Sequence, residues 1–302
     1  MKTRGILILS LLFCLMVFSV PVFSAEAIPI YDWDDLNNVR EGLDADYILM
    51  NDLDKYTTGY AIHIELQPGG WEPIGEFVPA VITGLRLGEW DADASSSPFT
   101  GTFNGNGFTI SDLFIDRYYN GTNVTDDPPS YDSFGQGLFG YIFGAEVYDL
   151  KVLNASVSGF RHVGILAGYS RASTLSDIET SGELFTRHNG GGLVGTLREN
   201  TLAQNCRSTA DVEGDSVDGG SLRTGGLFGA VHTSTVQDCS TDSTVRGDSY
   251  DTGGLAGSIY GTFTGDIENT NDLYNTSLYV GGSHIIRSHT TGTVYGNGAV
   301  GG

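Results

Sequence analysis

Paired carboxylates are the first residues in this sequence that could bind a ligand, because Ca²⁺ prefers oxygen ligands. Three pairs have their members two residues apart, but none continues into the longer ligand series of an EF-hand loop. In so acidic a chain we expect solvated surface carboxylates, with weak calcium binding as the alternative and no other cofactor. The pairs are Asp44 and Asp46, Asp52 and Asp54, and Asp91 and Asp93.

Two serine patterns are similar to catalytic motifs but lack the setting that those motifs need. Gly168-Tyr169-Ser170-Arg171-Ala172 superficially resembles a nucleophile elbow, which requires a strand-to-helix turn in an α/β sheet. Gly-Asp-Ser occurs at 214–216 and 247–249, at equivalent places in a repeat described below. Because these serines lie in predicted β repeats, we expect no catalytic residue among them.

Two Arg-His pairs could bind an anionic group or a sugar. Arg161-His162 and Arg187-His188 each precede a glycine-rich phrase, so stacking of neighbouring repeats would bring the pairs together at one edge. A sulfate, uronate or phosphate would suit such cationic pairs, and ordinary loop residues are the alternative. The six histidines include no His-Glu-x-x-His arrangement, so no zinc site is predicted.

Four Asn-x-Ser/Thr sequons could accept glycans in an exported protein. Asn120, Asn123 and Asn275 lie in predicted loops, whereas Asn154 lies within a predicted repeat. We expect glycosylation of these asparagines where the host has the machinery, with Asn154 the least accessible.

A glycine phrase recurs through the second half of the chain and places these residues relative to one another. Successive copies start 27, 28, 34, 28 and 48 residues apart, which indicates a period near 28 with insertions at about 219–223 and 262–282. Insertions at the corners of a stacked repeat leave its core unchanged. The copies begin at Gly137, Gly164, Gly192, Gly226 and Gly254, and a sixth begins at Gly301-Gly302.

Between the phrases, short alternating segments rich in Ser, Thr and Val are typical of strands closed by glycine turns. A period of 28 is too short for a propeller blade of about 40–45 residues, and it suits a coil of two or three short strands that pair in parallel with the next coil. The central leucines would then stack as a buried ladder: Leu138, Leu166, Leu193, Leu227 and Leu255.

The same alignment places Cys206 and Cys239 in one column of neighbouring coils. Cys206 lies eight residues before Gly214, and Cys239 lies eight before Gly247. A Cα separation near 5 Å would permit a disulfide, but parallel Cβ vectors in a stacked ladder are poorly oriented for one. A disulfide and a pair of buried free thiols are therefore both open. The full column is Leu150, Ile178, Cys206, Cys239 and Ser288.

The N-terminal part of the chain predicts a signal peptide and a cap. Residues 1–24 combine a basic start with an apolar run and a small-residue cleavage site, so we exclude them from the fold. Residues 32–40 have helical spacing and would cover the exposed end of the repeat. Strands are expected at 47–53 and 108–115, the latter after the turn signal at 104–107, and a loop is expected at 118–133.

The charge of the chain excludes two classes of partner. The formal net charge is −22, which disfavours nucleic acid and anionic membranes, and no apolar run after the signal could insert into a bilayer. A carboxylate-rich and lysine-poor surface is typical of adaptation to high salt, where self-repulsion is screened. An acidic exported protein without such adaptation is the alternative.

Gly191-Gly192-Leu193-Val194-Gly195 and its copies resemble the GLUG motif repeats of bacterial and archaeal surface proteins. The upstream motifs Tyr31 to Leu36, Gly70 to Gly75 and Phe99 to Ile110 are similar to the leader of such proteins. The resemblance implies a right-handed parallel β-helix, an all-β fold, and no catalytic residues. We divide the chain into a signal peptide (1–24), an N-terminal cap with the first coils and loop insertions (25–135), and GLUG-type repeats that stop within a phrase (136–302).

We therefore expect a secreted, non-enzymatic structural or adhesion module at a cell surface. Its partners would be cell-surface or matrix glycans or proteins, or other copies of itself. The alternatives are a β-helix enzyme that binds or cleaves polysaccharides, and a spacer for a further catalytic domain.

Overall fold

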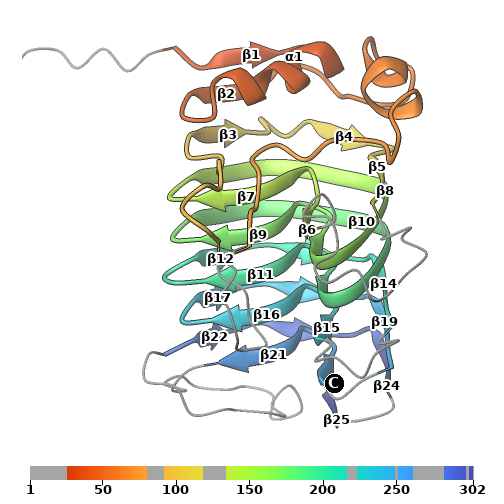
Figure 1. Cartoon of the computed structure of the whole chain (residues 1–302). Coiled ribbons are helices and arrows are strands. Elements are labelled where there is room, and N and C mark those ends of the chain that lie inside the picture. The colour runs from red at the N-terminus through yellow and green to blue at the C-terminus, as the bar shows by residue number, and fades with distance from the viewer. Residues whose placement is uncertain are drawn as a thin grey trace, which may run out of the picture.

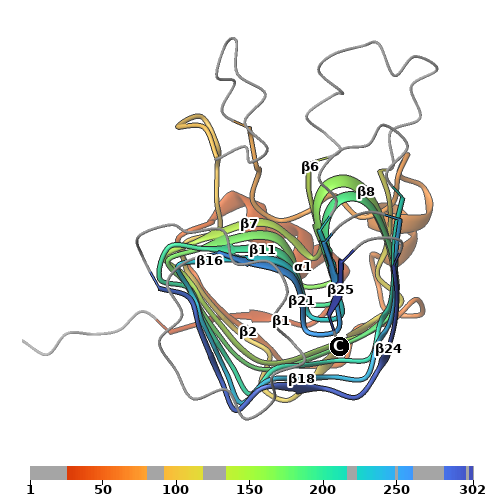
Figure 2. The ribbon, with the colours of Figure 1, turned by 90° about the horizontal axis from the view of Figure 1, so that it is seen from below.

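A computed structural model describes residues 26–79, 92–117, 134–215, 223–248, 251–260, 282–296 and 299–301. The chain is all-β apart from short helical segments near its N-terminus. It winds in successive turns that lie on one another from the red N-terminal end to the blue C-terminal end (Figure 1). Seen along the stack, the turns nearly superimpose (Figure 2), and every strand pair within the two sheets is parallel. The predicted all-β class and parallel pairing are thus confirmed.

The larger sheet forms four columns of strands along the stack. The first column contains β1 (Ile28–Ile30), β2 (Asp46–Leu49), β3 (Thr102–Asn104), the starts of β8 (Glu146–Gly164) and β10 (Thr174–Gly191), β12 (Leu202–Gln204), β17 (Thr235–Gln237) and β22 (His284–Ile286). The second contains β4 (Thr109–Ser111), the middle of β8 and β10, β13 (Arg207–Ser208), β18 (Ser240–Thr241) and β23 (His289–Thr290).

Two further columns of this sheet and the smaller sheet complete each turn. The third column contains β5 (Phe114–Asp116), β8, β10, β14 (Asp211–Gly214), β19 (Thr244–Gly247) and β24 (Thr293–Gly296). The fourth contains β6 (Phe134–Gln136), the ends of β8 and β10, β15 (Arg223–Gly225), β20 (Asp251–Gly253) and β25 (Ala299–Gly301). The smaller sheet contains β7 (Phe139–Phe143), β9 (Ala167–Arg171), β11 (Val194–Arg198), β16 (Phe228–His232) and β21 (Ala256–Tyr260).

Each complete turn thus has five strand segments, more than the two or three that the sequence indicated. The reason is that each of the five complete glycine phrases leads directly into a strand of the smaller sheet. In addition, the backbone of β8 and β10 stays extended around corners. The phrase itself is a tight corner: a Cβ added to Gly164 would lie 2.4 Å from the Ala167 carbonyl oxygen and 2.7 Å from that of Leu193. Such a corner has no room for any larger residue.

The register of the strands agrees with the repeat alignment. The backbone N–H of Leu166 donates to the Leu193 carbonyl at 3.0 Å, and that of Leu193 donates to the Leu227 carbonyl at 2.9 Å. All five ladder leucines are at most 1 % exposed, so the predicted aliphatic ladder forms the core. The predicted column also holds: Ile178 pairs with Leu150, and the pairing of adjacent residues brings Cys206, Cys239 and Ser288 into line.

The two insertions fall where the long repeat steps placed them. Thr186 pairs with Gly214, and Gly190 pairs with Thr224. Gly190 lies four positions after Thr186, but their partners Gly214 and Thr224 are ten positions apart, so the next turn contains the first insertion. Later, Tyr260 pairs with His232, and His284 pairs with Thr235. Thr235 lies three positions after His232, but their partners Tyr260 and His284 are twenty-four positions apart, which marks the second insertion. Most of the inserted residues lie outside the described ranges. The strand columns continue in register on either side of each insertion, as expected where a stacked repeat accepts insertions between strands.

The first turn is closed by helical segments at the predicted position. Helix α1 (Trp33–Asn38) is capped by Asp32, whose carboxylate accepts the backbone N–H of Asp35 at 3.0 Å, and it continues as a 3₁₀ turn at Val39–Glu41. Trp33, Leu36 and Val39 are fully buried, which confirms the predicted apolar face of the cap. A π-helical turn, Ala61–Glu65, lies beside it, and the ring of Tyr60 meets that of Trp33 edge-on at 5.5 Å.

The other N-terminal predictions hold with shorter strands. The expected strand at 47–53 is β2, Asp46–Leu49, and the expected strand at 108–115 is divided into β4 and β5. The division occurs at Asp112, whose φ of 60° turns the chain. Asn106 and Gly107 also have positive φ, as the turn signal indicated. The proposed signal peptide at 1–24 and the expected loop at 118–133 lie outside the described residues.

Candidate functional site: a groove on the outer face of the stack

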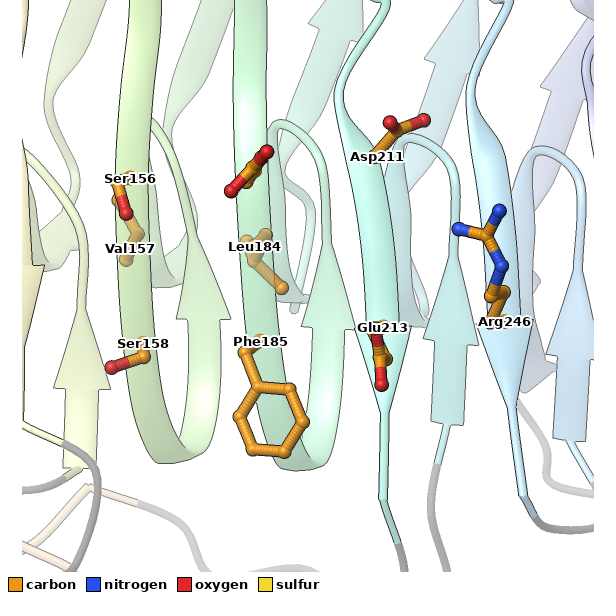
Figure 3. Close-up of a pocket in the computed structure, with 9 residues that line it drawn as sticks. Ser156, Val157, Ser158, Leu184, Phe185, Asp211, Glu213 and Arg246 are labelled. Carbon is orange, nitrogen blue, oxygen red and sulfur yellow. The ribbon is translucent and has the colours of Figure 1, made fainter.

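A groove of about 370 Å³ crosses the outer face of the third strand column, formed by β8, β10, β14 and β19 (Figure 3). Side chains alternate along each strand, so Val157, Leu184 and Val212 point into the core while their neighbours point outward. The groove is therefore built on a rigid apolar base. Its lining residues are Ser156, Val157, Ser158, Glu183, Leu184, Phe185, Asp211, Glu213 and Arg246.

Strand register arranges the outward residues in two rows that run along the stack. In one row Phe185 pairs with Ser158 on one side and with Glu213 on the other, and Glu213 pairs with Arg246. The row continues to Tyr295, the partner of Arg246 on β24. In the other row Glu183 lies between Ser156 and Asp211. Neighbours within a row are about 4.8 Å apart, which is the spacing of hydrogen-bonded strands.

The groove combines one guanidinium with three exposed carboxylates. Although Glu213 and Arg246 are register partners, they form no ion pair with each other, and Figure 3 shows their head groups pointing apart. Arg246 instead lies 5.5 Å over the ring of Tyr295, itself 56 % exposed. Beside the groove, the Ser158 hydroxyl donates to Asp116 at 2.7 Å. The charged groups of the groove thus keep their hydrogen-bonding capacity for a ligand.

The predicted Arg-His pairs do lie on adjacent turns. Arg161 pairs with His188 across β8 and β10. Arg161 and His162 are buried, at 8 % and 1 % exposed, whereas Arg187 and His188 are partly exposed. An anion or sugar contact at these four residues stays a prediction, in which Arg187 and His188 are the accessible members.

His162 lies inside a cluster of rings and polar groups. Its Nδ1 is 2.8 Å from the Thr196 hydroxyl, and its ring lies 5.0 Å from that of Phe77 and 5.2 Å from that of Tyr169. Complete burial, reinforced by nearby cations of which Arg161 is the strongest, holds the pKa of His162 well below its usual range. His162 is therefore neutral near pH 7 and adds no positive charge to the predicted pair.

Cys206 and Cys239 are both buried with free thiols in this structure. A disulfide between them stays a prediction. Their hydrogen bond to each other and their burial raise the pKa of Cys206. The Sγ atoms also lie near backbone carbonyls, at 3.2 Å from Gln204 for Cys206 and 3.3 Å from Gln237 for Cys239. A protonated, buried thiol is a poor nucleophile, which fits a packing role.

Of the sequon asparagines, Asn154 lies within the described residues. Contrary to the expected low accessibility, it is exposed at a corner with a φ of 52°. Its side-chain nitrogen donates to Asp112 at 2.6 Å. A glycan attached to this nitrogen would leave one N–H to donate. Asn120, Asn123 and Asn275 lie outside the described residues, and glycosylation at all four stays a prediction.

The other candidate residues are a buried serine and carboxylates bound by nearby backbone and hydroxyl groups. Ser170 is fully buried within strand β9, where no strand-to-helix turn occurs. Asp54 accepts the backbone N–H of Tyr56 and the hydroxyl of Thr57, and Asp52 accepts the N–H of Thr109. Across the described ranges, no group of three or more His, Cys, Asp or Glu residues has the arrangement of a metal site. Asp91 lies outside those ranges.

Sequence reasoning missed the groove, although a signal for part of it was present. Glu213 and Arg246 immediately precede Gly214 and Gly247, the two glycines that align the repeats. Their shared column could have been read from that alignment. Phe185 and Glu183 follow the same register, but no glycine phrase marks them.

Comparison with solved structures finds a protein of similar fold. The structure resembles that of a candidate immunoglobulin A1 protease from Bacteroides ovatus with a TM-score of 0.55, over 91 % of this chain and 71 % of that one. At 19 % sequence identity this likeness concerns the fold alone.

In sequence, the chain is similar to Halomucin of Haloquadratum walsbyi, with 36 % identity over 113 residues. The match covers 37 % of this chain and 1 % of Halomucin, so the chain spans a small part of that protein's length. No protein-family model matches the chain, and the resemblance to GLUG repeats stays a prediction. None of the helices in the described ranges has the length and apolar character needed to cross a bilayer.

Proposed function

We propose that this chain is a non-enzymatic extracellular module, a rigid rod that serves structure or adhesion at a cell surface. The observation that carries the proposal is the continuous parallel pairing from β1 to β25 around one hydrophobic core, which includes the buried ladder of leucines. In our proposal the turns form a right-handed parallel β-helix of about 28 residues per coil, with GLUG-type phrases at one corner. Parallel crossovers are right-handed in almost all proteins.

Three features support an extracellular setting in high salt. The net charge of −22 with few lysines suits a surface that stays hydrated while salt screens its self-repulsion. The similarity to Halomucin of Haloquadratum walsbyi supports a surface protein of a halophile. The sequence features of residues 1–24 support export. The sequons would then carry glycans on loops displayed by the rod.

The proposal can be tested with beads coated with the full chain after the signal peptide. In molar KCl, we expect the beads to bind to halophilic cells, to isolated cell-surface material, or to each other through copies of the chain. Beads coated with another acidic protein of similar net charge are the control. Retention no greater than the control on every surface would contradict adhesion and leave the structural role.

A second function is favoured by one observation in the groove. Glu183 and Asp211 are register partners on adjacent strands, so two exposed carboxylates lie side by side. Paired carboxylates are the groups that hydrolyse glycosidic bonds in many enzymes. Incubation with polysaccharides and analysis of the products distinguishes the two functions: we expect no shorter products, and their appearance would favour a polysaccharide-cleaving enzyme.

A further inference from the structure

We propose that the outer groove binds a neutral oligosaccharide chain, whose sugar rings lie along the stack over β8, β10, β14 and β19. The inference rests on the proposed extracellular function, because it names a partner for the same rod. It is carried by the aromatic, acidic and basic side chains that strand register places in the groove.

The ring of Phe185 is the aromatic side chain among the residues that line the groove. It projects from β10 between Ser158 and Glu213 (Figure 3). The C–H face of a pyranose ring packs on an aromatic face, because both surfaces lose contact with water. Three strands further along the same row, Tyr295 offers a second exposed ring. Three steps of about 4.8 Å separate these two rings by about 14 Å, enough for several sugar residues.

The groups around Phe185 match the hydroxyls of a sugar. Glu183, Asp211 and Glu213 are exposed carboxylates that accept hydrogen bonds from hydroxyl groups, and such charge-assisted bonds are stronger than neutral ones. Arg246 supplies the donors in the row, beside Glu213 but without an ion pair to it. The Ser156 hydroxyl adds a neutral partner on the neighbouring strand.

The charge of the groove selects among glycans. With three carboxylates and one guanidinium it carries a net charge of about −2, on a protein whose own charge is −22. A uronate or sulfated chain would be repelled and would leave buried like charges facing one another. A neutral chain avoids this cost, and its binding depends on hydrogen bonds and ring contact, which molar salt leaves in place.

The groove is also prepared for a ligand before binding. Its backbone is held on both sides by parallel strand pairing, and the inward neighbours Val157, Leu184 and Val212 are at most 2 % exposed. Because the backbone beneath these side chains is already fixed, ligand binding does not have to order it, and this favours affinity.

The test measures binding of a panel of neutral hexasaccharides of glucose, galactose and mannose by calorimetry in molar KCl, with a galacturonate hexamer as the anionic comparison. We expect the chain to bind at least one neutral hexamer and to bind the galacturonate hexamer at least about tenfold more weakly. Phe185→Ala is expected to weaken neutral binding at least about fivefold, and the isosteric Glu213→Gln at least about threefold.

Matched variants outside the groove control for general effects. Phe143→Ala removes a comparable ring, 39 % exposed, from β7, and Glu146→Gln alters an exposed carboxylate at the start of β8. Both should retain wild-type affinity. Circular dichroism of each variant checks that it is folded, and the isosteric Glu213→Gln keeps the test informative if Phe185→Ala unfolds.

Three outcomes would overturn the inference: no neutral hexamer binds, the galacturonate hexamer binds more tightly, or the groove variants bind as well as the wild type. Bead adhesion measured with the same proteins separates this failure from failure of the proposed function. Beads that still adhere while the groove binds no glycan leave the adhesion module standing. If the groove binds hexamers and also shortens them, the binding site is supported but the proposed non-enzymatic function is wrong.

Discussion

The imidazole of His162 lies where a positive charge would be costly. It is enclosed by the rings of Phe77 and Tyr169 and lies near the cations Arg161, Arg198 and Arg223, with His188 also close by. Each of these lowers the pKa of His162 in the folded chain, with desolvation the largest cause. The folded protein therefore holds a neutral histidine that the unfolded chain can protonate.

This difference predicts a loss of stability in acid. Below the ordinary histidine pKa of about 6.5 the unfolded chain binds a proton that folded His162 does not, so the free energy of unfolding falls with decreasing pH by up to about 1.4 kcal/mol per unit. Denaturant titrations between about pH 7 and pH 5 should show a shallower fall for His162→Asn than for the wild type. His289→Asn, at an exposed position, is the control. Equal slopes in all three proteins would contradict the prediction.

At the scale of elements, one corner of the stack is a column of polar residues with left-handed backbone. Short polar side chains tolerate this conformation better than most residues. Neighbours in the column interact: the Asn205 amide donates to Asp177 at 3.2 Å, and Arg287 donates to Asp238 at 2.6 Å. Asp149 and Asp177 are instead adjacent like charges. The column is Asp149, Asp177, Asn205, Asp238 and Arg287, with φ between 46° and 55°.

Replacement of Asp149 by Asn should therefore stabilise the chain in low salt. Asn keeps the left-handed backbone and removes the repulsion from Asp177, with an expected gain of about 0.2–1 kcal/mol. The gain should shrink in about 3 M KCl, where the screening length is below 3 Å. Denaturant unfolding at both salt concentrations measures this. Asp238→Asn, which loses the ion pair with Arg287, should give no gain, and a gain equal to that of Asp149→Asn would show that charge repulsion is not the cause.

The glycine corners make a separate prediction about packing. Gly164→Asn places a Cβ 2.4 Å from one backbone carbonyl and 2.7 Å from another, so we expect a loss of at least about 2 kcal/mol in the free energy of unfolding. Gly144 has a φ of 63° with no atom within 4 Å of its added Cβ, and Asn tolerates that backbone, so Gly144→Asn should change stability by under about 0.5 kcal/mol. Similar losses at both positions would mean that glycine is needed for flexibility rather than for space.

At the scale of the whole molecule, one continuous hydrophobic core, of which the leucine ladder is a part, must hold a strongly charged surface together. Hydrophobic burial and parallel pairing run the length of the stack, whereas the net charge of −22 opposes compaction. Repulsion between exposed carboxylates is screened by salt, and the buried ladder is not weakened by it. The balance between these contributions depends on ionic strength.

We accordingly expect the thermal midpoint of unfolding to rise as KCl increases from about 0.1 M to about 2 M, as measured by circular dichroism. Sucrose at equal osmolarity is the control for solute exclusion, and it should raise the midpoint less. A midpoint that is insensitive to KCl, or that responds equally to sucrose, would contradict a role for the surface charge.

The sequence by itself determined which residues lie on one another in successive turns of this protein. Because parallel stacking places equivalent residues on one another, the glycine phrases alone gave the leucine ladder, the alignment of Cys206 with Cys239 and the sites of both insertions. The helical spacing of Trp33, Leu36 and Val39 likewise gave the cap. These features repeat along the chain or depend on neighbours within one element.

Only the tertiary structure decided how the strands and corners are arranged within each turn. The number of strand segments, the burial of His162 and the union of Phe185, Glu213 and Arg246 in one groove depend on where each corner bends. A change of one residue at a corner reverses which side chains face the core, since side chains alternate along a strand. The sequence specifies that alternation, but the packing of all the turns together selects its phase.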